Sequence, residues 1–291
     1  MSSPENGTRQ TAYEIEVRDV WARKVVWNSG KVKSAQSQLV SCADAALEKD
    51  RHYTWRVRVW DEADTPSAWS APSDFSILTS EAAFAGSEWI GAITRKDARI
   101  PEGRKYHGSE LKKPEAKAAW AAVDTLAKKS IYLRRESHVA KKVKDATAYV
   151  CGLGFYEFSL NGEKVGDSEF APLWSDYDKS VYYNTYDVTS QVKKGGNAIG
   201  VLLGNGFYNV QGGRYRKLQI SFGAPTLRFR MVVNYEDGTS ETIVSGKDWK
   251  YDFSPVLFNC IYGGEDYDAR REQKGVNMVR LKSDGLASSY S

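Results

Sequence analysis

The feature that most limits the fold of this chain is an alternation of apolar and polar residues, repeated in short segments that are separated by turn residues. In HYTWRVRVW, the side chains of Tyr53, Trp55, Val57 and Val59 fall on one face of an extended strand, and the intervening residues fall on the other. The segment 12–20, AYEIEVRDV, alternates in the same way. A period of two predicts half-buried strands of an antiparallel sheet.

Four or five such strands between Thr11 and Thr79 predict a small β-sandwich of the immunoglobulin or fibronectin type III kind. Strand signals return at Ile131 and include the two-residue turns Asn161–Gly162 and Asp237–Gly238. Many short strands at near-regular spacing predict a second, larger antiparallel sandwich, a jelly roll. The predicted fold class is therefore mainly β.

One stretch, residues 110–129, has the composition of a helix, and Trp120, Val123 and Ala127 form an apolar stripe along it. We interpret it as a packing helix in the connection between the two sandwiches. With about 150 residues per domain, 291 residues correspond to about two domains. The predicted division is 1–80 for the first sandwich, 81–130 for the connection, 131–270 for the jelly roll and 271–291 for a polar tail.

Composition excludes several classes of function. The formal net charge of +4 is small and dispersed, so nucleic acid is not an expected partner. The three cysteines, Cys42, Cys151 and Cys260, have neither disulfide-scaffold nor metal-ligand spacing. No apolar run approaches the roughly 20 residues of a membrane span, and the first residues lack the pattern of a secretory leader. A membrane partner is not expected either.

Several strings, in order, resemble the amino-terminal region of bacterial α-L-rhamnosidases. They are GKVKSAQSQLV, YTWRVRVWDEADTPSAWSAPSDFSI, SEWIGA, LNGEKVG, APLWSDYDKSVYYNTYDVT, GVLLGNGFYN and IYGGEDYDARRE. The resemblance implies a fibronectin-III-like module, here without its first strand, and then the jelly roll. It also implies that the catalytic acid and base belong to a helical (α/α)6 barrel that follows, so no residue of this chain is predicted to be catalytic. A periplasmic or extracellular location rests on the resemblance alone.

The first candidate site is WSDYDKSVYY. In an extended segment Asp176 and Asp178 point to the same side in line with Trp174, and Tyr177 points to the opposite side. Two carboxylates could hold Ca²⁺, and a neighbouring ring could stack on the C–H face of a sugar. In some rhamnosidases the jelly roll holds L-rhamnose with calcium, which the resemblance extends to these residues. The alternative is that the aspartates are simply solvated.

The second candidate is the glycine-rich loop GNGFYNVQGGRYRK. Asn205, Tyr208 and Arg214 are, with Asn209 and Tyr215, the polar and flat side chains that sugar binding requires. The alternative is a structural loop in which Phe207 and Tyr208 pack inward.

The third candidate, residues 262–272, contains Glu265, Asp266 and Asp268 beside Arg270 and Arg271. Glycoside hydrolysis needs two carboxyl groups roughly 5 to 9.5 Å apart across the bond, which neighbours in sequence rarely span. We therefore interpret these charges as an ion-paired domain junction.

The sequence as a whole predicts a non-catalytic portion of an α-L-rhamnosidase-like protein. Its expected partners are a rhamnose-containing glycan or glycoside and, in the intact protein, an intramolecular catalytic barrel. Two alternatives remain open: purely structural domains that brace that barrel, and a chain that is itself the rhamnosidase.

Overall fold

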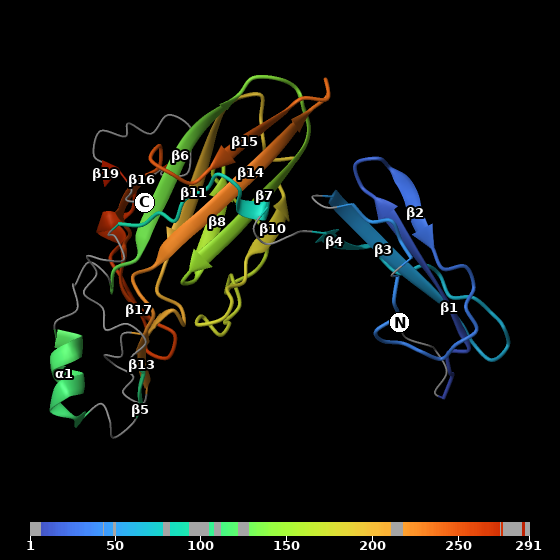
Figure 1. The fold of residues 1–291 in the computed structure, drawn as a ribbon, viewed down its shortest axis with the longest axis horizontal. Coiled ribbons are helices and arrows are strands. Elements are labelled where there is room, and N and C mark those ends of the chain that lie inside the picture. The colour runs from blue at the N-terminus through green and yellow to red at the C-terminus, as the bar shows by residue number, and fades with distance from the viewer. Residues whose placement is uncertain are drawn as a thin grey trace. The chain divides into compact units, whose positions relative to one another are not determined.

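The computed structural model describes residues 7–42, 44–48, 51–77, 82–92, 105–107, 112–121, 128–210, 218–273, 275 and 287–288. The chain divides into two compact units, Met1–Ala83 and Phe84–Ser291. Figure 1 shows that the described elements of both units are almost all strands. The mainly β fold class is confirmed.

The described strands of the first unit form one antiparallel sheet in the order β2-β1-β3-β4. The strands are β1 (Ala12–Asp19), β2 (Lys24–Asn28), β3 (Arg51–Trp60) and β4 (Ser73–Ile77). The register of β1 against β3 pairs Ile15 with Val57 and Tyr13 with Val59, so the apolar residues of both strands share one face. The predicted alternation is confirmed in these two strands.

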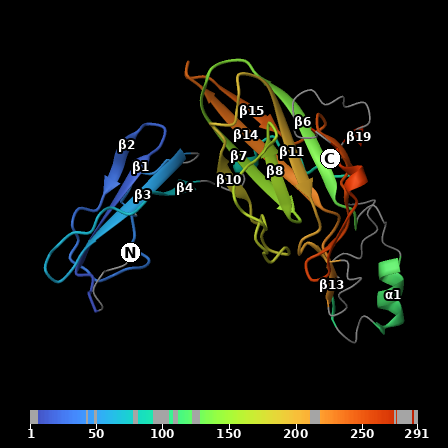
Figure 2. The ribbon, with the colours of Figure 1, turned by 180° about the vertical axis from the view of Figure 1, so that it is seen from behind.

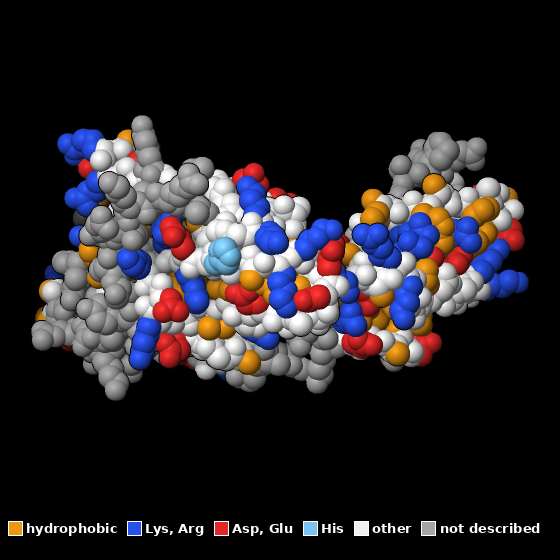
Figure 3. All heavy atoms as spheres, turned by 90° about the horizontal axis from the view of Figure 1, so that it is seen from above, with side chains coloured by type: hydrophobic (Ala, Val, Ile, Leu, Met, Phe, Trp, Pro, Cys, Tyr) orange, Lys and Arg blue, Asp and Glu red, His pale blue; other side chains and the backbone are white. Residues whose placement is uncertain are grey.

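The opposite face of this sheet carries a stack of cations and indole rings. The guanidinium carbons of Arg56 and Arg58 lie 4.5 and 4.8 Å from the ring centroid of Trp69, and that of Arg58 lies 5.0 Å from Trp60. Glu16 Oε1 forms an ion pair with Arg56 Nη2 at 2.8 Å. Seen from above, Lys and Arg side chains lie beside apolar side chains on this unit (Figure 3). The cation–π contacts of Arg56 and Arg58 hold the segment that contains Trp69 against the sheet.

The second unit is a sandwich of two main antiparallel sheets (Figures 1 and 2). One sheet has the order β10-β7-β14-β15, from β7 (Val143–Leu153), β10 (Asn184–Asp187), β14 (Thr226–Tyr235) and β15 (Ser240–Val244). The other has the order β19-β16-β6-β11-β8-β9, from β6 (Ile131–Val139), β8 (Tyr156–Leu160), β9 (Glu163–Lys164), β11 (Gly195–Leu203), β16 (Lys250–Phe253) and β19 (Ala287–Ser288).

Smaller elements lie around these sheets. They are the strands β5 (Lys105–His107), β12 (Asn209–Val210), β13 (Leu218–Ser221), β17 (Val256–Cys260) and β18 (Gly264–Tyr267), the 3₁₀ helices η1 (Ala82–Phe84) and η4 (Ala269–Arg271), and the helix α1 (Pro114–Ala121). The helix predicted over 110–129 is thus observed from Pro114 to Ala121, and Val123 and Ala127 of its apolar stripe lie outside the described residues. No helix in the described part of the chain is both long and apolar enough to cross a membrane.

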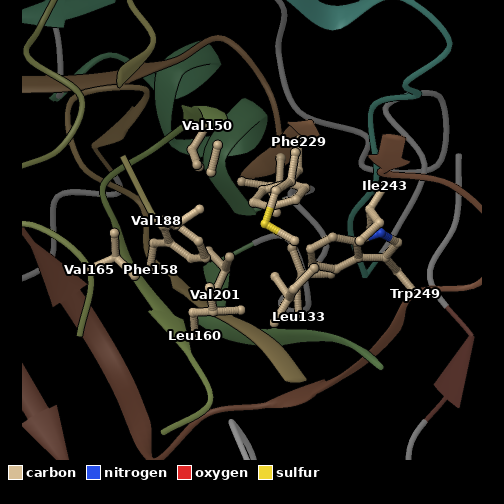
Figure 4. Packing of buried hydrophobic residues seen from close by; sticks show 14 of the residues in the cluster. Leu133, Val150, Phe158, Leu160, Val165, Val188, Val201, Phe229, Ile243 and Trp249 are labelled. Atoms are coloured by element: carbon tan, nitrogen blue, oxygen red, sulfur yellow. The ribbon is translucent and has the colours of Figure 1, made fainter. Parts of the chain in front are cut away.

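The core of the second unit lies between its two main sheets (Figure 4). Leu133, Phe158 and Val201 come from one sheet, and Phe229 and Ile243 come from the other. The rings of Phe158 and Phe229 meet edge to face across the layers, with centroids 5.6 Å apart. Burial of each such side chain contributes about 1.5 to 3 kcal/mol, so this core gives a rigid frame to the loops at its ends.

Candidate functional site

Four segments of the second unit meet at one end of the sandwich. The turn between β7 and β8 contacts the loop after β11, where Gly204 N–H donates to the carbonyl of Phe155 at 2.8 Å. Gly154, with φ of 126°, lies so close to this loop that a Cβ there would collide with the carbonyl oxygen of Gly204. Gly206, with φ of 52°, approaches the backbone of Phe155 in the same way. These glycines therefore allow two loops to pack backbone to backbone.

Five aromatic rings form a continuous group on these segments, which we call the aromatic cluster: Phe155, Phe170, Trp174, Phe207 and Tyr262. Trp174 stacks on Phe207 with ring centroids 4.8 Å apart and planes 17° apart. The other three neighbouring pairs, Phe155 with Phe170, Phe155 with Phe207, and Phe207 with Tyr262, have centroids 5.5 to 5.9 Å apart. The stacked geometry fixes the plane of the Trp174 indole.

Much of the aromatic cluster is open to solvent. Trp174 is 61% exposed, Phe170 and Tyr262 are exposed as well, and so is Leu173, the neighbour of Trp174 in the chain. Phe207 is half-buried beneath Trp174. Exposed apolar side chains that adjoin one another on a rigid frame mark a surface for binding a ligand or another protein.

The two aspartates beside Trp174 are both exposed. Asp176 Oδ2 forms an ion pair with Lys179 Nζ at 3.0 Å, and its carbonyl accepts from Lys179 N–H and Ser180 N–H, both at 2.8 Å. The hydrogen bond to Asp176, with the charges of Asp176 and Asp178, raises the pKa of Lys179. Among the described residues, no group of three or more His, Cys, Asp or Glu side chains could hold a metal ion. The calcium site stays a prediction.

Asn205, from the second candidate loop, is fully buried. Its Nδ2 donates to the carbonyl of Lys128 at 2.9 Å, its backbone N–H donates to Asn259 Oδ1 at 2.8 Å, and its Oδ1 accepts from Asn209 Nδ2 at 2.8 Å. The first two bonds join the loop to two other parts of the unit, and the third joins Asn205 to Asn209 within the loop. The Asn205 side chain therefore stabilises the conformation of the loop. A contact between Asn205 and a sugar stays a prediction.

Tyr208 and Tyr177 belong to a second group of buried rings, with Phe222. Tyr208 is buried, and its hydroxyl donates to the carbonyl of Phe222 at 2.9 Å. Tyr177 meets Tyr208 edge to face, with centroids 5.2 Å apart, and burial raises the pKa of Tyr177 to about 12. Arg214 lies outside the described residues. The structure thus brings Trp174 together with Phe207, and it places Tyr177 and Tyr208 in a separate group of rings.

Sequence reasoning missed Phe155, Phe170 and Tyr262 as members of the aromatic cluster. A local signal existed for Phe155, which follows a Gly-x-Gly break that interrupts the strand pattern at Gly152 and Gly154. Phe207, which packs inward in the structural alternative for this loop, is half-buried and stacks on Trp174.

The third candidate segment contains the ion pairs that the sequence suggested. Asp268 Oδ1 pairs with Arg270 Nε at 2.8 Å, and Asp268 Oδ2 lies 3.7 Å from Arg271 Nε. The hydrogen bond from Arg270 lowers the pKa of Asp268, although desolvation opposes it. Asp268 also caps η4 by accepting from the N–H of Arg270. This carboxylate holds the local fold, and its pairing with arginine keeps it ionised.

Comparison with known families matches both units. The family described as "Alpha-L-rhamnosidase N-terminal domain" matches residues 141–289, and the family described as "Rha78A-like, N-terminal immunoglobulin domain" matches residues 1–78. Among curated relatives, an alpha-L-rhamnosidase of Formosa agariphila is 38% identical over 278 residues, covering 91% of this chain and 28% of the relative. The chain thus spans little more than a quarter of that relative's length.

Solved structures agree with these matches. An alpha-L-rhamnosidase of Aspergillus terreus has a TM-score of 0.75 at 28% identity, and the match covers 99% of this chain and 30% of that one. An alpha-L-rhamnosidase of Dictyoglumus thermophilum has a TM-score of 0.70 at 31% identity, and the match covers 99% of this chain and 31% of that one. A Streptomyces avermitilis alpha-L-rhamnosidase, solved in complex with L-rhamnose, shares the fold at 24% identity with a TM-score of 0.74, over 100% of this chain and 42% of that one. The chain belongs to the alpha-L-rhamnosidase N-terminal domain family.

Proposed function

We propose that this chain is an accessory region of an alpha-L-rhamnosidase and that its second unit binds a terminal L-rhamnose on the indole of Trp174. The observation that carries the proposal is the stacking of Trp174 on Phe207, which leaves the Trp174 side chain 61% exposed. A pyranose presents a face of C–H groups that packs against an aromatic ring, and the 6-methyl group of rhamnose extends its apolar area. A ring already held in place loses little conformational entropy on binding.

Two acidic residues close in sequence to Trp174 also favour a sugar as the ligand. Asp176 and Asp178 are exposed and close in sequence to Trp174, so their carboxylates could accept hydrogen bonds from sugar hydroxyls. If calcium takes part, the carboxylate of Asp176 would give up its ion pair with Lys179 and bind the cation instead. Backbone carbonyls would then supply further oxygen ligands to the calcium. The proposed role of both residues is binding and orientation of the sugar.

The proposal assigns no catalytic step to this chain. Asp176 and Asp268, two carboxylates of the candidate segments, are ion-paired with Lys179 and Arg270 respectively. The hydrogen bond from Arg270 lowers the pKa of Asp268, which is the opposite of what a general acid needs at neutral pH. Hydrolysis of the rhamnosyl bond is therefore assigned to the part of a full-length protein that this chain does not contain.

Isothermal titration with L-rhamnose, in the presence of Ca²⁺ and in EDTA, tests the binding proposal. We expect saturable heat with a dissociation constant in the range of about 10 μM to 1 mM, which is typical of a small exposed site. D-glucose, which lacks the apolar methyl group, is the control sugar and should bind at least about tenfold more weakly. The absence of heat at millimolar L-rhamnose in both buffers would overturn the proposal.

Two further measurements separate the neighbouring alternatives. The variants Asp176→Ala and Asp178→Ala should lower the affinity only in Ca²⁺ if the cation is bound there, and in both buffers if the carboxylates contact the sugar directly. Incubation of the purified chain with an aryl rhamnoside should release no more aryl alcohol than a blank does. Release above the blank would show that the chain itself is a rhamnosidase.

A structural role is the second candidate, and one observation favours it. Phe170 and Leu173 are as exposed as Trp174 and carry no polar group for a sugar. An apolar surface of this kind also suits packing against another domain. Two results together would support this candidate. The chain would bind no sugar but would associate with the separately produced remainder of a full-length rhamnosidase, and the Leu173→Asp variant would fail to associate.

A further inference from the structure

Tyr262 belongs to the aromatic cluster but not to its stacked pair. It lies in the turn 261–263 between β17 and β18, at one end of the second unit (Figure 1). Tyr262 is 48% exposed, and its ring meets that of Phe207 edge to face, with centroids 5.9 Å apart. An exposed ring thus adjoins the Trp174 indole on which we place the rhamnose, and it has no part in that contact.

The backbone around Tyr262 is held in a tight turn. Gly263 N–H donates to the carbonyl of Cys260 at 2.9 Å, and Gly264, with φ of 75°, pairs with Cys260 across the two strands. Glycine adopts a φ of this sign at little cost, whereas other residues rarely do. Cys260 is buried, so the base of the turn is anchored in the unit. The turn therefore presents the Tyr262 side chain from a defined backbone.

The strand that leads into this turn is also joined to the loop that carries Phe207. Asn259, on β17, accepts the backbone N–H of Asn205 at 2.8 Å, and its own amide donates to the hydroxyl of Ser130. Tyr262 and Phe207 are therefore linked through their backbones as well as through their rings. Rings whose positions are fixed before a ligand arrives lose little conformational entropy when it binds.

Trp174 and Tyr262 contact the same ring at different inclinations. The plane of the indole lies at 17° to that of Phe207, whereas the plane of the Tyr262 ring lies at 78° to it. The two exposed rings therefore do not form one flat platform, and a single face of one sugar cannot stack on both. A sugar on the open face of the indole lies on the side away from Phe207, while Tyr262 contacts Phe207 itself. This arrangement places Tyr262 against a different part of the ligand.

We propose that Tyr262 forms a second subsite, for the sugar residue to which the terminal L-rhamnose is attached; this inference rests on the proposed function. The ligand is then a rhamnosyl disaccharide or the end of a longer glycan, rather than rhamnose alone. The Tyr262 ring offers apolar area to the C–H groups of a second pyranose, and its hydroxyl can donate to or accept from sugar hydroxyls. Trp174 holds the terminal sugar, and Tyr262 selects ligands in which a second sugar follows it.

Isothermal titration of the full chain with sugars of different length tests this subsite. Methyl α-L-rhamnopyranoside supplies one sugar residue, and the disaccharides rutinose and neohesperidose supply a second, since each joins L-rhamnose to a different hydroxyl of D-glucose. At least one disaccharide should bind about 2- to 13-fold more tightly than the methyl rhamnoside, the gain that one aromatic contact gives. Tyr262→Ala should remove this gain. Its affinity for the methyl rhamnoside should stay unchanged, which also shows that the variant is folded.

Tyr267→Ala is the matched control, because Tyr267 lies on β18, is 51% exposed and is outside the aromatic cluster. It should bind each sugar as the original chain does, and loss of the disaccharide gain in this variant too would contradict the subsite.

Equal affinity of the original chain for the methyl rhamnoside and both disaccharides would overturn the second subsite and leave the rhamnose site in place. A Tyr262→Ala variant that keeps the disaccharide gain would also overturn the subsite. So would a variant that loses affinity for all three sugars alike, since Tyr262 would then contact the rhamnose itself. No heat with any of the three sugars would overturn the proposed function together with the subsite.

Discussion

The indole of Trp174 lies parallel to the ring of Phe207, with centroids 4.8 Å apart, at the end of the second sandwich. The loop that carries Phe207 is anchored by Asn205, whose backbone N–H donates to Asn259 and whose side-chain amide donates to Lys128. One face of the indole is therefore occupied and the other is presented to solvent. We therefore expect substitution of the exposed indole and substitution of the residues that anchor it to have different effects.

Trp174→Ala should reduce the affinity for L-rhamnose by about 2- to 13-fold, because one stacked ring contributes about 0.5 to 1.5 kcal/mol. The free energy of unfolding should fall by no more than about 1.5 kcal/mol, the upper contribution of its stacked pair with Phe207. Titration calorimetry and urea unfolding measure the two quantities. Tyr267→Ala removes an exposed ring of the same unit outside the aromatic cluster and should leave the affinity unchanged. Equal affinity of Trp174→Ala and the original chain would refute a stacking role.

Asn205→Ala should lower the free energy of unfolding by about 1 to 3 kcal/mol, because the Lys128 carbonyl and the Asn209 amide lose their buried partner. Urea unfolding at neutral pH measures this loss, with Trp174→Ala as the exposed control. A loss of sugar affinity without a loss of stability would instead show that Asn205 contacts the ligand directly.

The strands could be predicted from the sequence because their signal is local. In β14 the burial alternates at every residue from Thr226 to Tyr235, as a period of two requires. The ion pairs of Asp268 were also predictable, since Arg270 and Arg271 follow it closely along the chain.

The composition of the candidate site was predictable only in part. Trp174 is visible as an aromatic residue in a polar segment, but Phe207 stacks on it from another segment, and Phe155 and Tyr262 contact Phe207 from two more. Asn205 looks like a surface residue of a glycine-rich loop, and only the position of the Lys128 carbonyl shows why it is buried. Contacts between distant segments follow from packing of the whole unit, which no local pattern encodes.

The three thiols should differ sharply in reactivity. Burial raises the pKa of Cys151 to about 12, the charge of Arg228 opposes this only in part, and the thiol donates to the carbonyl of Tyr182 at 3.3 Å. At pH 8 very little of the Cys151 side chain is then in the reactive thiolate form. Cys260 is also buried, whereas Cys42 is partly exposed. A disulfide reagent at low protein concentration should therefore label one thiol quickly and the other two only on unfolding. The rapid phase should vanish in Cys42→Ser, and its survival there would contradict the prediction.

Glu14 on β1 should make the first unit sensitive to acid. Burial alone would raise the pKa of its carboxyl, but a hydrogen bond from Asn28 Nδ2 at 3.0 Å and the ion pair with Arg58 at 2.6 Å outweigh burial, and the pKa is lowered. A carboxyl with a lowered pKa stabilises the fold above its unfolded pKa of about 4.3, and this stabilisation disappears as the pH falls through the lower folded value.

Glu14→Gln should therefore destabilise the first unit at pH 7, and the difference from the original chain should stay constant down to about pH 5 and narrow below about pH 4. Urea unfolding followed by tryptophan fluorescence at several pH values measures this difference. Glu163→Gln, which changes an exposed carboxylate on β9, is the control and should leave stability unchanged at every pH. A difference between Glu14→Gln and the original chain that is as large at pH 3 as at pH 7 would show that the hydrogen bonds of Glu14 stabilise the sheet regardless of its charge.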